Sequence, residues 1–174
     1  VGAVRVDRMR VREDDVFDRL VDPGRPIPAV ATSVHGITDE MVEGRSRLPT
    51  VLADLVRFGE DAVIVGHDIA FDLAFLRPVE QQTDTPLPSR VLDVLLLSAV
   101  LHPAEGESHS LDALARRYGT PVLGRHTALG DALVTAEILV RMIDELAGVG
   151  ITTYGEAVAA AGATPLAKEA GKRF

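Results

Sequence analysis

Cysteine and tryptophan are both absent from the 174-residue sequence, and aromatic residues make up only 4% of it. Without cysteine the chain cannot contain a disulfide framework, a thiolate zinc site or a cysteine nucleophile. The absence is compatible with a reducing compartment, and we expect a cytoplasmic protein. The longest apolar run, Val94 to Leu101, is interrupted by Ser98 and is far shorter than the roughly 20 residues that a membrane-spanning helix needs. We therefore expect no membrane partner.

The charge balance restricts the ways in which the chain could bind nucleic acid. It has 18 Lys and Arg residues against 26 Asp and Glu residues, a formal net charge of −8. Any nucleic acid must therefore be bound through a local basic patch or through metal ions. At 47% hydrophobic residues, the sequence is long and apolar enough for one domain with a substantial core.

The hydrophobic pattern predicts an α/β fold. Alternating and β-branched residues over 1–21 indicate an antiparallel strand pair that turns near residues 7–9. Two further apolar strands, at 62–65 and 91–94, each precede a helical pattern, at 69–76 and 95–101, which is typical of a parallel sheet. Because proline cannot continue a helical hydrogen-bond ladder, we expect Pro78 to end the first of these helices.

Three more helices are predicted in the second half of the chain. Ser110 is placed to cap a helix over Leu111–Tyr118, and the longest helical pattern runs from about Ala128 to Leu146. The last pattern, Tyr154–Ala161, is alanine-rich and precedes a charged end, so we expect a loosely docked helical tail.

The segment GHDIAFDLAFL, residues 66–76, carries the strongest local signal for function. It places Asp72 one turn into a helix that follows an apolar strand, at the sheet edge where open α/β folds have their sites. Structural roles compete with this hypothesis, because Asp68 could be a helix cap and Asp72 an ordinary first-turn acid. Asp93, after the next strand, could support the site or simply cap the helix that follows.

A second signal is the segment RHTALGD, residues 125–131, at the start of the longest predicted helix. His126 would accept a proton near neutral pH, and Asp131 is a hard oxygen ligand suited to magnesium. A histidine near a helix start is often only a cap or a surface group. Two acids and a histidine on separate elements nevertheless suit a metal-assisted hydrolysis, which needs ligands that converge from several elements.

Together these segments resemble a known family. The sequence resembles the DEDDh, or DnaQ-like, 3′-5′ exonucleases of the ribonuclease H-like fold, similar to the proofreading exonuclease subunit of bacterial DNA polymerase III. The resemblance covers Val1 to about Leu146 and rests on the ordered series GAVRV, PGRPIP, HGIT, GHxxxFDxxFL, SLDALARRYG and RHTALGDAxxTA. It implies a mixed central sheet flanked by helices, and hydrolysis of nucleic-acid 3′ ends to nucleoside 5′-monophosphates.

The resemblance also implies roles for individual residues. In the family four acids hold two divalent ions, Mg²⁺ or Mn²⁺, and a histidine activates the attacking water. Asp72 and Asp131 correspond to two of these metal ligands, and His126 corresponds to the general base.

Further residues match positions that would bind the substrate. They are His35 and Gly36 in HGIT, Phe71 beside the second-motif acid, and Arg125, which could contact a phosphate. For His35, a purely turn-forming role beside Gly36 is an equal alternative.

The family's first motif, an Asp-x-Glu on the first and central strand, has no counterpart in this sequence. Two of the four metal acids are thus missing, and the acids of residues 7–15 are better explained as solvated hairpin charges. Omitting the strand leaves a gap of roughly 9.6 Å, twice the interstrand spacing, that no backbone hydrogen bond can cross. The sheet would have to close up, recruit another segment or unfold.

We accordingly expect residues 1–147 to be an exonuclease domain that is incomplete at its N-terminus, followed by a helical tail over 148–174. We expect the natural protein to extend upstream, and the 174-residue chain to have little or no activity. The expected partners are a single-stranded 3′ end of DNA or RNA and a polymerase or a fused upstream domain. The alternative is a catalytically inactive module of the same fold that binds nucleic acid or a partner.

Overall fold

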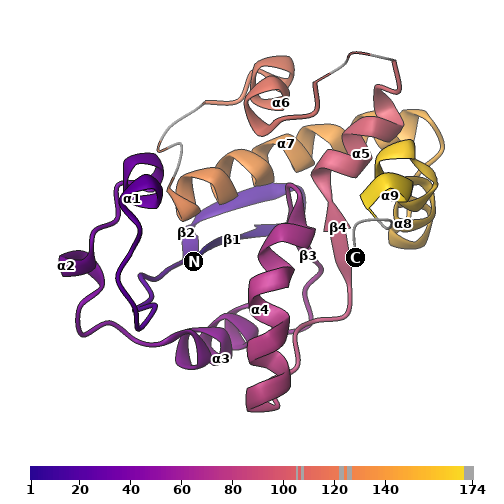
Figure 1. Cartoon of the computed structure of the whole chain (residues 1–174). Helices are drawn as coiled ribbons and strands as arrows, with labels where there is room; N and C mark the ends of the chain where they lie inside the picture. The colour runs from indigo at the N-terminus through magenta and orange to yellow at the C-terminus, as the bar shows by residue number, and fades with distance from the viewer. Residues whose placement is uncertain (105, 107, 122–123, 125–126, 171–174) are drawn as a thin grey trace.

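The computed structural model describes residues 1–104, 106, 108–121, 124 and 127–170 (Figure 1). The strands in this part of the chain are β1 (Gly2–Asp7), β2 (Arg10–Asp18), β3 (Ile64–Gly66) and β4 (Val91–Asp93). The helices are α1 (Ala29–His35), α2 (Asp39–Val42), α3 (Leu48–Phe58), α4 (Ile69–Thr83), α5 (Val94–Leu101), α6 (Leu111–Tyr118), α7 (Ala128–Gly148), α8 (Tyr154–Ala163) and α9 (Pro165–Ala170). The fold is α/β, as the sequence predicts.

The strands form two separate sheets. β1 pairs antiparallel with β2, and β3 pairs parallel with β4 in a register that ends at Gly66 and Asp93. The single mixed sheet that we expected is therefore not found among the described residues, where β1 and β3 each pair on one side only. In the part of the chain that the structure describes, the sheet has neither closed up nor recruited another segment. Backbone pairing needs strands about 4.8 Å apart, so each half keeps only its own ladder.

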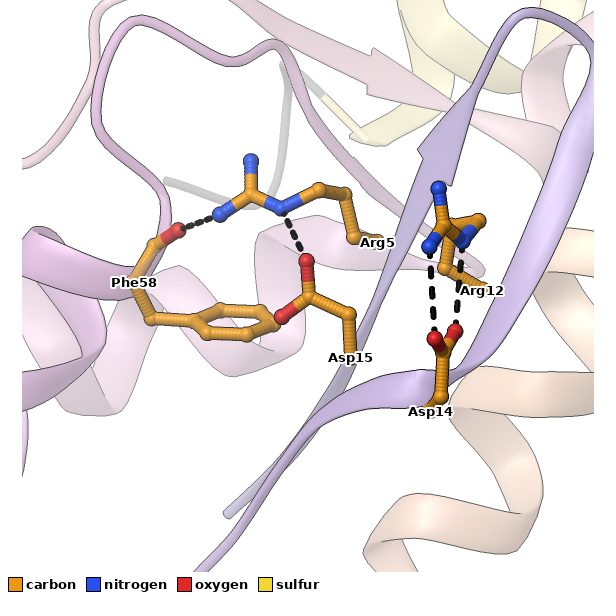
Figure 2. Close-up of polar contacts among 5 residues, drawn as sticks. All are labelled: Arg5, Arg12, Asp14, Asp15 and Phe58. Atoms are coloured by element: carbon orange, nitrogen blue, oxygen red, sulfur yellow. Dashed lines mark hydrogen bonds and ion pairs between the residues drawn. The ribbon is translucent and has the colours of Figure 1, made fainter.

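The β1–β2 hairpin contacts the end of α3 through Arg5 and through Phe17, whose ring centroid lies 5.8 Å from that of Phe58. The pairing shifts between Val4 and Arg5, which leaves residues 13–15 of β2 without a partner on β1. Arg5 lies next to this bulge. Its Nε donates to the Asp15 carboxylate at 2.7 Å, and its Nη2 donates to the Phe58 carbonyl at the end of α3 (Figure 2). Arg12 and Asp14 form a second, more exposed ion pair. These acids are hairpin charges, as the sequence indicates.

The long helix α7 joins the two sheets and carries much of the core. It packs against β1 and β2, and it also contacts β3, α5 and α6 (Figure 1). Gly2 at the start of β1 lies so close to its first turn that an added Cβ would be 2.3 Å from the Ala128 carbonyl carbon. The core cluster includes Leu97, Leu114, Ile138 and Met142.

Two expectations about helices are wrong. α4 continues through Pro78 to Thr83. Both Pro78 and Ala74, whose carbonyl loses its helical donor, are exposed, so water can satisfy that carbonyl. Glu80 in the next turn also accepts a hydrogen bond from the Leu87 N–H at 2.8 Å.

The second wrong expectation concerns the C-terminal part. α8 is not loosely docked, because its small residues Ala157 and Ala161 lie in the core cluster and the helix packs against α5. Its first residue, Tyr154, also reaches β4, where its hydroxyl accepts a hydrogen bond from the Val91 N–H at 3.1 Å. None of the helices in the described part of the chain combines the length and apolar content required of a membrane span.

Candidate functional site

The start of β1 lies against the first turn of α7 and within electrostatic range of Asp72 in the first turn of α4, so it neighbours both turns that carry a predicted acid. Asp72 is in the first turn of α4, and Asp131 is in the first turn of α7. The Val1 amino group is close enough to Asp72 for the two charges to interact, while Gly2 packs against Ala128. The fold thus brings two acids from distant parts of the sequence to the same end of the hairpin.

The carboxyl group of Asp72 occupies a position that disfavours its charge. Partial burial raises its pKa above the ordinary value, and the nearby carboxylates of Asp68 and Asp93 raise it further. A backbone hydrogen bond and the Val1 amino group act in the opposite direction. A cation bound beside Asp72 would offset the repulsion between its carboxylate and those of Asp68 and Asp93. The environment of Asp72 therefore suits a cation ligand.

The start of α7 is fixed by a tight turn. Thr127 Oγ1 accepts a hydrogen bond from the Gly130 N–H at 3.1 Å and donates one to the Gly124 carbonyl at 2.6 Å. This turn packs directly on Gly130, where an added Cβ would be 1.9 Å from the Gly124 oxygen. Arg125 and His126, the predicted phosphate contact and general base, lie outside the described residues.

His35 serves as a turn residue and also lines a cavity. Its Nδ1 accepts a hydrogen bond from the Ile37 N–H at 3.0 Å, while Gly36 adopts the left-handed conformation, with φ of 73°, that ends α1. His35 faces a cavity of about 370 Å³ whose lining includes Val1 and Leu48. Both interpretations of His35 are therefore compatible with the structure, and the cavity adjoins the chain start that neighbours Asp72.

Phe71 stands out from the surface immediately before Asp72. Its side chain is 65% exposed, and that of Phe75, one turn further along α4, is 60% exposed. The two rings meet edge to face, with centroids 5.2 Å apart and an interplanar angle of 63°. This arrangement presents aromatic surface to solvent beside the acid.

The N-terminus of α4 is capped by Asp93. Asp68 occupies the N-cap position in the left-handed conformation, and its side chain makes no capping hydrogen bond. The Asp93 carboxylate instead accepts from the N–H groups of Asp68 at 3.0 Å, Ile69 at 3.2 Å and Leu95 at 2.9 Å. The expected side-chain cap by Asp68 is thus wrong, because the left-handed backbone is not the extended conformation of capping residues. Asp93 caps the helix that follows it and also supports α4.

His67 makes a hydrogen bond that the sequence did not predict. Its Nε2 lies 2.6 Å from the His109 carbonyl, and because a carbonyl only accepts, Nε2 must donate. The His109 ring in turn pairs through Nδ1 with the hydroxyl of buried Ser98 at 2.9 Å. These bonds attach the segment before α6 to the end of β3, next to the start of α4. A histidine directly after an apolar strand was the available signal.

The described residues contain no group of three or more acidic or histidine side chains placed to share a metal ion. The donors that are present still suit a hard divalent cation, because Asp72 and Asp131 both offer carboxylate oxygens. Mg²⁺ is commonly held by one or two carboxylates together with substrate phosphates. Such a site would be completed by the substrate.

Comparison with known proteins shows similarity to an exonuclease family and to proteins named after DNA polymerase III. The family described as "Exonuclease" matches residues 1–139. A DNA polymerase III subunit epsilon-like protein of Rhodobacter capsulatus is 46% identical over 157 residues, which cover 89% of this chain and 22% of that protein. A PolC-type DNA polymerase III of Latilactobacillus sakei is 36% identical over 148 residues, which cover 83% of this chain and 10% of that polymerase. The chain therefore spans only a minor part of these relatives.

A solved structure supports the fold. Exonuclease X, determined in complex with 5′ overhanging duplex DNA, superposes with a TM-score of 0.69 at 24% identity, and the match covers 91% of this chain and 87% of that one. This likeness concerns the fold alone, whereas the family match spans more than half of the sequence. On that match, and on the relatives above, the chain belongs to the DnaQ-like 3′-5′ exonuclease family.

Proposed function

We propose that this chain is a metal-dependent exonuclease module that removes nucleotides from the 3′ end of DNA as nucleoside 5′-monophosphates. The observation that carries the proposal is the position of Asp72 and Asp131 in the first turns of two helices that flank the start of β1. Membership of the exonuclease family supports the reaction class. The relatives' names, which refer to DNA polymerase III, favour DNA as the substrate and a polymerase as the partner.

Asp72 and Asp131 would hold Mg²⁺ or Mn²⁺. A divalent ion bound there would lower the pKa of a water molecule and offset the charge that develops on the phosphoryl oxygens. The raised pKa of Asp72 fits this role, since a cation stabilises the ionised carboxylate that its neighbours disfavour. His126 precedes the capped start of α7 in the sequence and would take the proton of the attacking water as a neutral imidazole.

The remaining candidate residues would bind the end of the strand. Phe71, exposed beside Asp72, offers a face on which an unpaired base can stack, a contact that does not depend on sequence. His35 borders the cavity near Val1, and with its neighbour Gly36 it would contact the terminal nucleotide, while Arg125 would contact a phosphate. Because the chain carries a net charge of −8, such local contacts have to replace long-range attraction.

We also propose that the 174-residue chain works slowly, because its sequence contains no Asp-x-Glu to supply the other two acids of the family site. The test is a single-turnover assay with the chain in excess over a 5′-labelled single-stranded oligonucleotide. Wild type, Asp72→Asn and Asp131→Asn are compared with Mn²⁺, with Mg²⁺ and with chelator. Asp144→Asn, an exposed substitution near the other end of α7, is the matched control.

We expect slow shortening that requires the metal, is lost in Asp72→Asn and Asp131→Asn, and persists in Asp144→Asn. Fusing a strand that bears Asp-x-Glu to the chain should increase the rate. Digestion that survives both substitutions or the chelator would overturn the proposal, as would a complete lack of hydrolysis by the wild-type chain and the fusion alike.

A further inference from the structure

Asp93 joins the ends of two neighbouring strands through a single carboxylate. Its backbone is the last paired residue of β4, in register with Gly66, the last residue of β3. From there Oδ1 accepts from the Asp68 and Leu95 N–H groups, at 3.0 and 2.9 Å, and Oδ2 accepts from the Ile69 N–H at 3.2 Å. The same side chain therefore caps α5, on its own segment, and α4, on the adjacent one.

Helix α4 depends on this cap because its own N-cap residue supplies none. The Asp68 backbone has φ of 56° and ψ of 47°, and its side chain does not bond back to the first turn. The first N–H groups of a helix need an acceptor, and here two of them find it on the neighbouring strand. The alternative acceptor is water, which would leave the helix start free to shift relative to the sheet.

Asp72 is one turn beyond this junction, in the first turn of α4. α4 also packs against α3, but none of its side chains, residues 69–83, is fully buried, so the bonds at residues 68–69 contribute directly to the placement of its first turn. A rotation or translation at residues 68–69 would be carried along the rigid first turn to the Asp72 carboxylate. Displacements of about 1 Å can cost a catalytic group a hundredfold in rate.

We propose that Asp93 is a positioning residue, which holds the start of α4 so that Asp72 faces the reacting phosphate. The proposal rests on the exonuclease function proposed above, and it adds a residue that acts through Asp72 without contacting the substrate. A purely structural cap would affect stability alone. A positioning role also requires that loss of the cap changes the rate of the chemical step.

Two substitutions separate the contacts. Asp93→Asn keeps an oxygen that can accept from Asp68 and Leu95, but it turns an amide donor toward the Ile69 N–H. Asp93→Ala removes all three bonds. Thr153→Ala is the matched control, because it deletes the side-chain cap of α8, which accepts from the Glu156 N–H at 3.3 Å, away from α4. Circular dichroism establishes that each variant is folded.

The first readout needs no activity. Amide hydrogen exchange of Asp68 and Ile69, and residual dipolar couplings of the α4 amides, are measured on the full chain. We expect Ile69 exchange to accelerate about tenfold or more in Asp93→Asn, since the Asp93 oxygen that accepts from its N–H is replaced by a donor. In Asp93→Ala, the α4 couplings should change while those of α7 remain as in wild type. Unchanged exchange and couplings in both variants would overturn the inference.

The second readout is the single-turnover rate at a saturating concentration of the chain, together with the concentration of the chain that gives half of this rate. We expect Asp93→Asn to lower the rate roughly ten- to a hundredfold with little change in half-saturation, and Thr153→Ala to leave both unchanged. Equal rates for Asp93→Asn and Thr153→Ala would reduce Asp93 to a structural cap. If neither the wild type nor the fusion that bears Asp-x-Glu hydrolyses the oligonucleotide while α4 still shifts in Asp93→Ala, the exonuclease proposal fails and the placement of α4 by Asp93 stands.

Discussion

The ionised carboxylate of Asp72, a candidate site residue, lowers the free energy of unfolding of the chain. Desolvation by the surrounding atoms, together with the field of Asp68 and Asp93, raises its pKa from the ordinary value of 3.8, although the residue lies at the surface. A carboxyl group with a raised pKa in the folded state binds its proton more tightly there than in the unfolded chain. Its ionisation therefore lowers the free energy of unfolding as the pH rises through the raised pKa.

Asp72→Asn should for this reason make the chain more stable at neutral pH while it abolishes hydrolysis. Thermal unfolding at pH 7 in chelator is the measurement, and we expect a higher Tm than for wild type. The difference should shrink as the pH falls below 3.8, where the wild-type carboxyl is protonated in both states. Asp144→Asn, on the exposed side of α7, should leave the Tm nearly unchanged. A lower Tm for Asp72→Asn would mean that its charge stabilises the fold.

At the residue scale, the sequence predicted where Asp72 and Asp131 lie on their helices, but not the contacts that fix those helices. A polar residue after an apolar strand and a helical pattern place Asp72 and Asp131 in first turns, as found. The pattern offered Asp68 as a cap of α4 and gave Asp93 only a role in the site or as the cap of the helix that follows it. The cap of α4 by Asp93 depends on the register in which Gly66 pairs with Asp93, a long-range feature that neither segment encodes alone.

At the scale of single elements, the start of α7 is determined by the close approach of a turn to a glycine. Gly130→Ala would place a methyl group 1.9 Å from the Gly124 carbonyl oxygen. We expect a loss of about 1–3 kcal/mol in the free energy of unfolding, because a backbone carbonyl cannot move aside cheaply. Urea unfolding measures it.

The same helix offers a matched control in Gly148, where an added Cβ meets nothing within 4 Å. Gly148→Ala should be neutral or stabilising by up to about 1 kcal/mol, the ordinary helix preference for alanine. If both substitutions stabilise the chain equally, the turn at residue 124 does not pack on α7 as described.

Helix α8 begins with a capping box that responds to pH. The Glu156 carboxylate accepts from the backbone N–H groups of Thr152 and Thr153 at 2.8 and 2.9 Å, and these bonds lower its pKa below the ordinary 4.5. A carboxylate whose pKa is lower in the folded than in the unfolded chain stabilises the fold at any pH above its ordinary pKa. This stabilisation is lost as the pH falls through the lowered pKa.

Glu156→Gln should therefore lower the Tm at pH 7, and the difference from wild type should disappear in the acid range. Glutamine and protonated glutamate are both neutral acceptors, so the two proteins become equivalent there. Thermal melts from pH 7 to pH 3 test this. A difference that stays constant over the whole range would show that the charge of Glu156 does not contribute.

The sequence predicted most helices but misjudged the end of α4 and the docking of α8. Ser110 caps α6 and Gly119 ends it, as local rules indicate. The passage of α4 through Pro78 and the docking of α8 were not predictable in the same way. The first depends on the exposure of Ala74, and the second on small alanine side chains that fit closely against α5.

At the scale of the whole molecule, the strands divide into two sheets because β1 pairs only with β2 and β3 pairs only with β4 among the described residues. The sequence predicted the strands of each half and a gap between them, but whether the halves would merge depends on packing, here on α7 spanning both. Residues Val1 and Arg19 exchange both backbone hydrogen bonds, at 2.8 and 2.9 Å. The alternation of an antiparallel ladder then directs the Ala3 N–H toward β2 and the Val4 N–H away from it.

Hydrogen exchange should reveal this alternation. We expect the Ala3 amide to be protected nearly as well as the core and the Val4 amide to exchange at least tenfold faster, because its N–H lies on an unpaired edge. Exchange followed by NMR on the 174-residue chain is the measurement. Equal protection of Ala3 and Val4 would show that another strand pairs with this edge of β1.

The most direct test of the account is the identity of the product released from a strand labelled at its 5′ end. Wild type and Asp72→Asn are incubated in excess with a single-stranded oligonucleotide and Mn²⁺, and the released material is analysed by mass spectrometry. We predict slow, stepwise release of nucleoside 5′-monophosphates from the 3′ end by wild type and none by Asp72→Asn. Release from the 5′ end, products with 3′-phosphates, or equal digestion by Asp72→Asn would contradict the account.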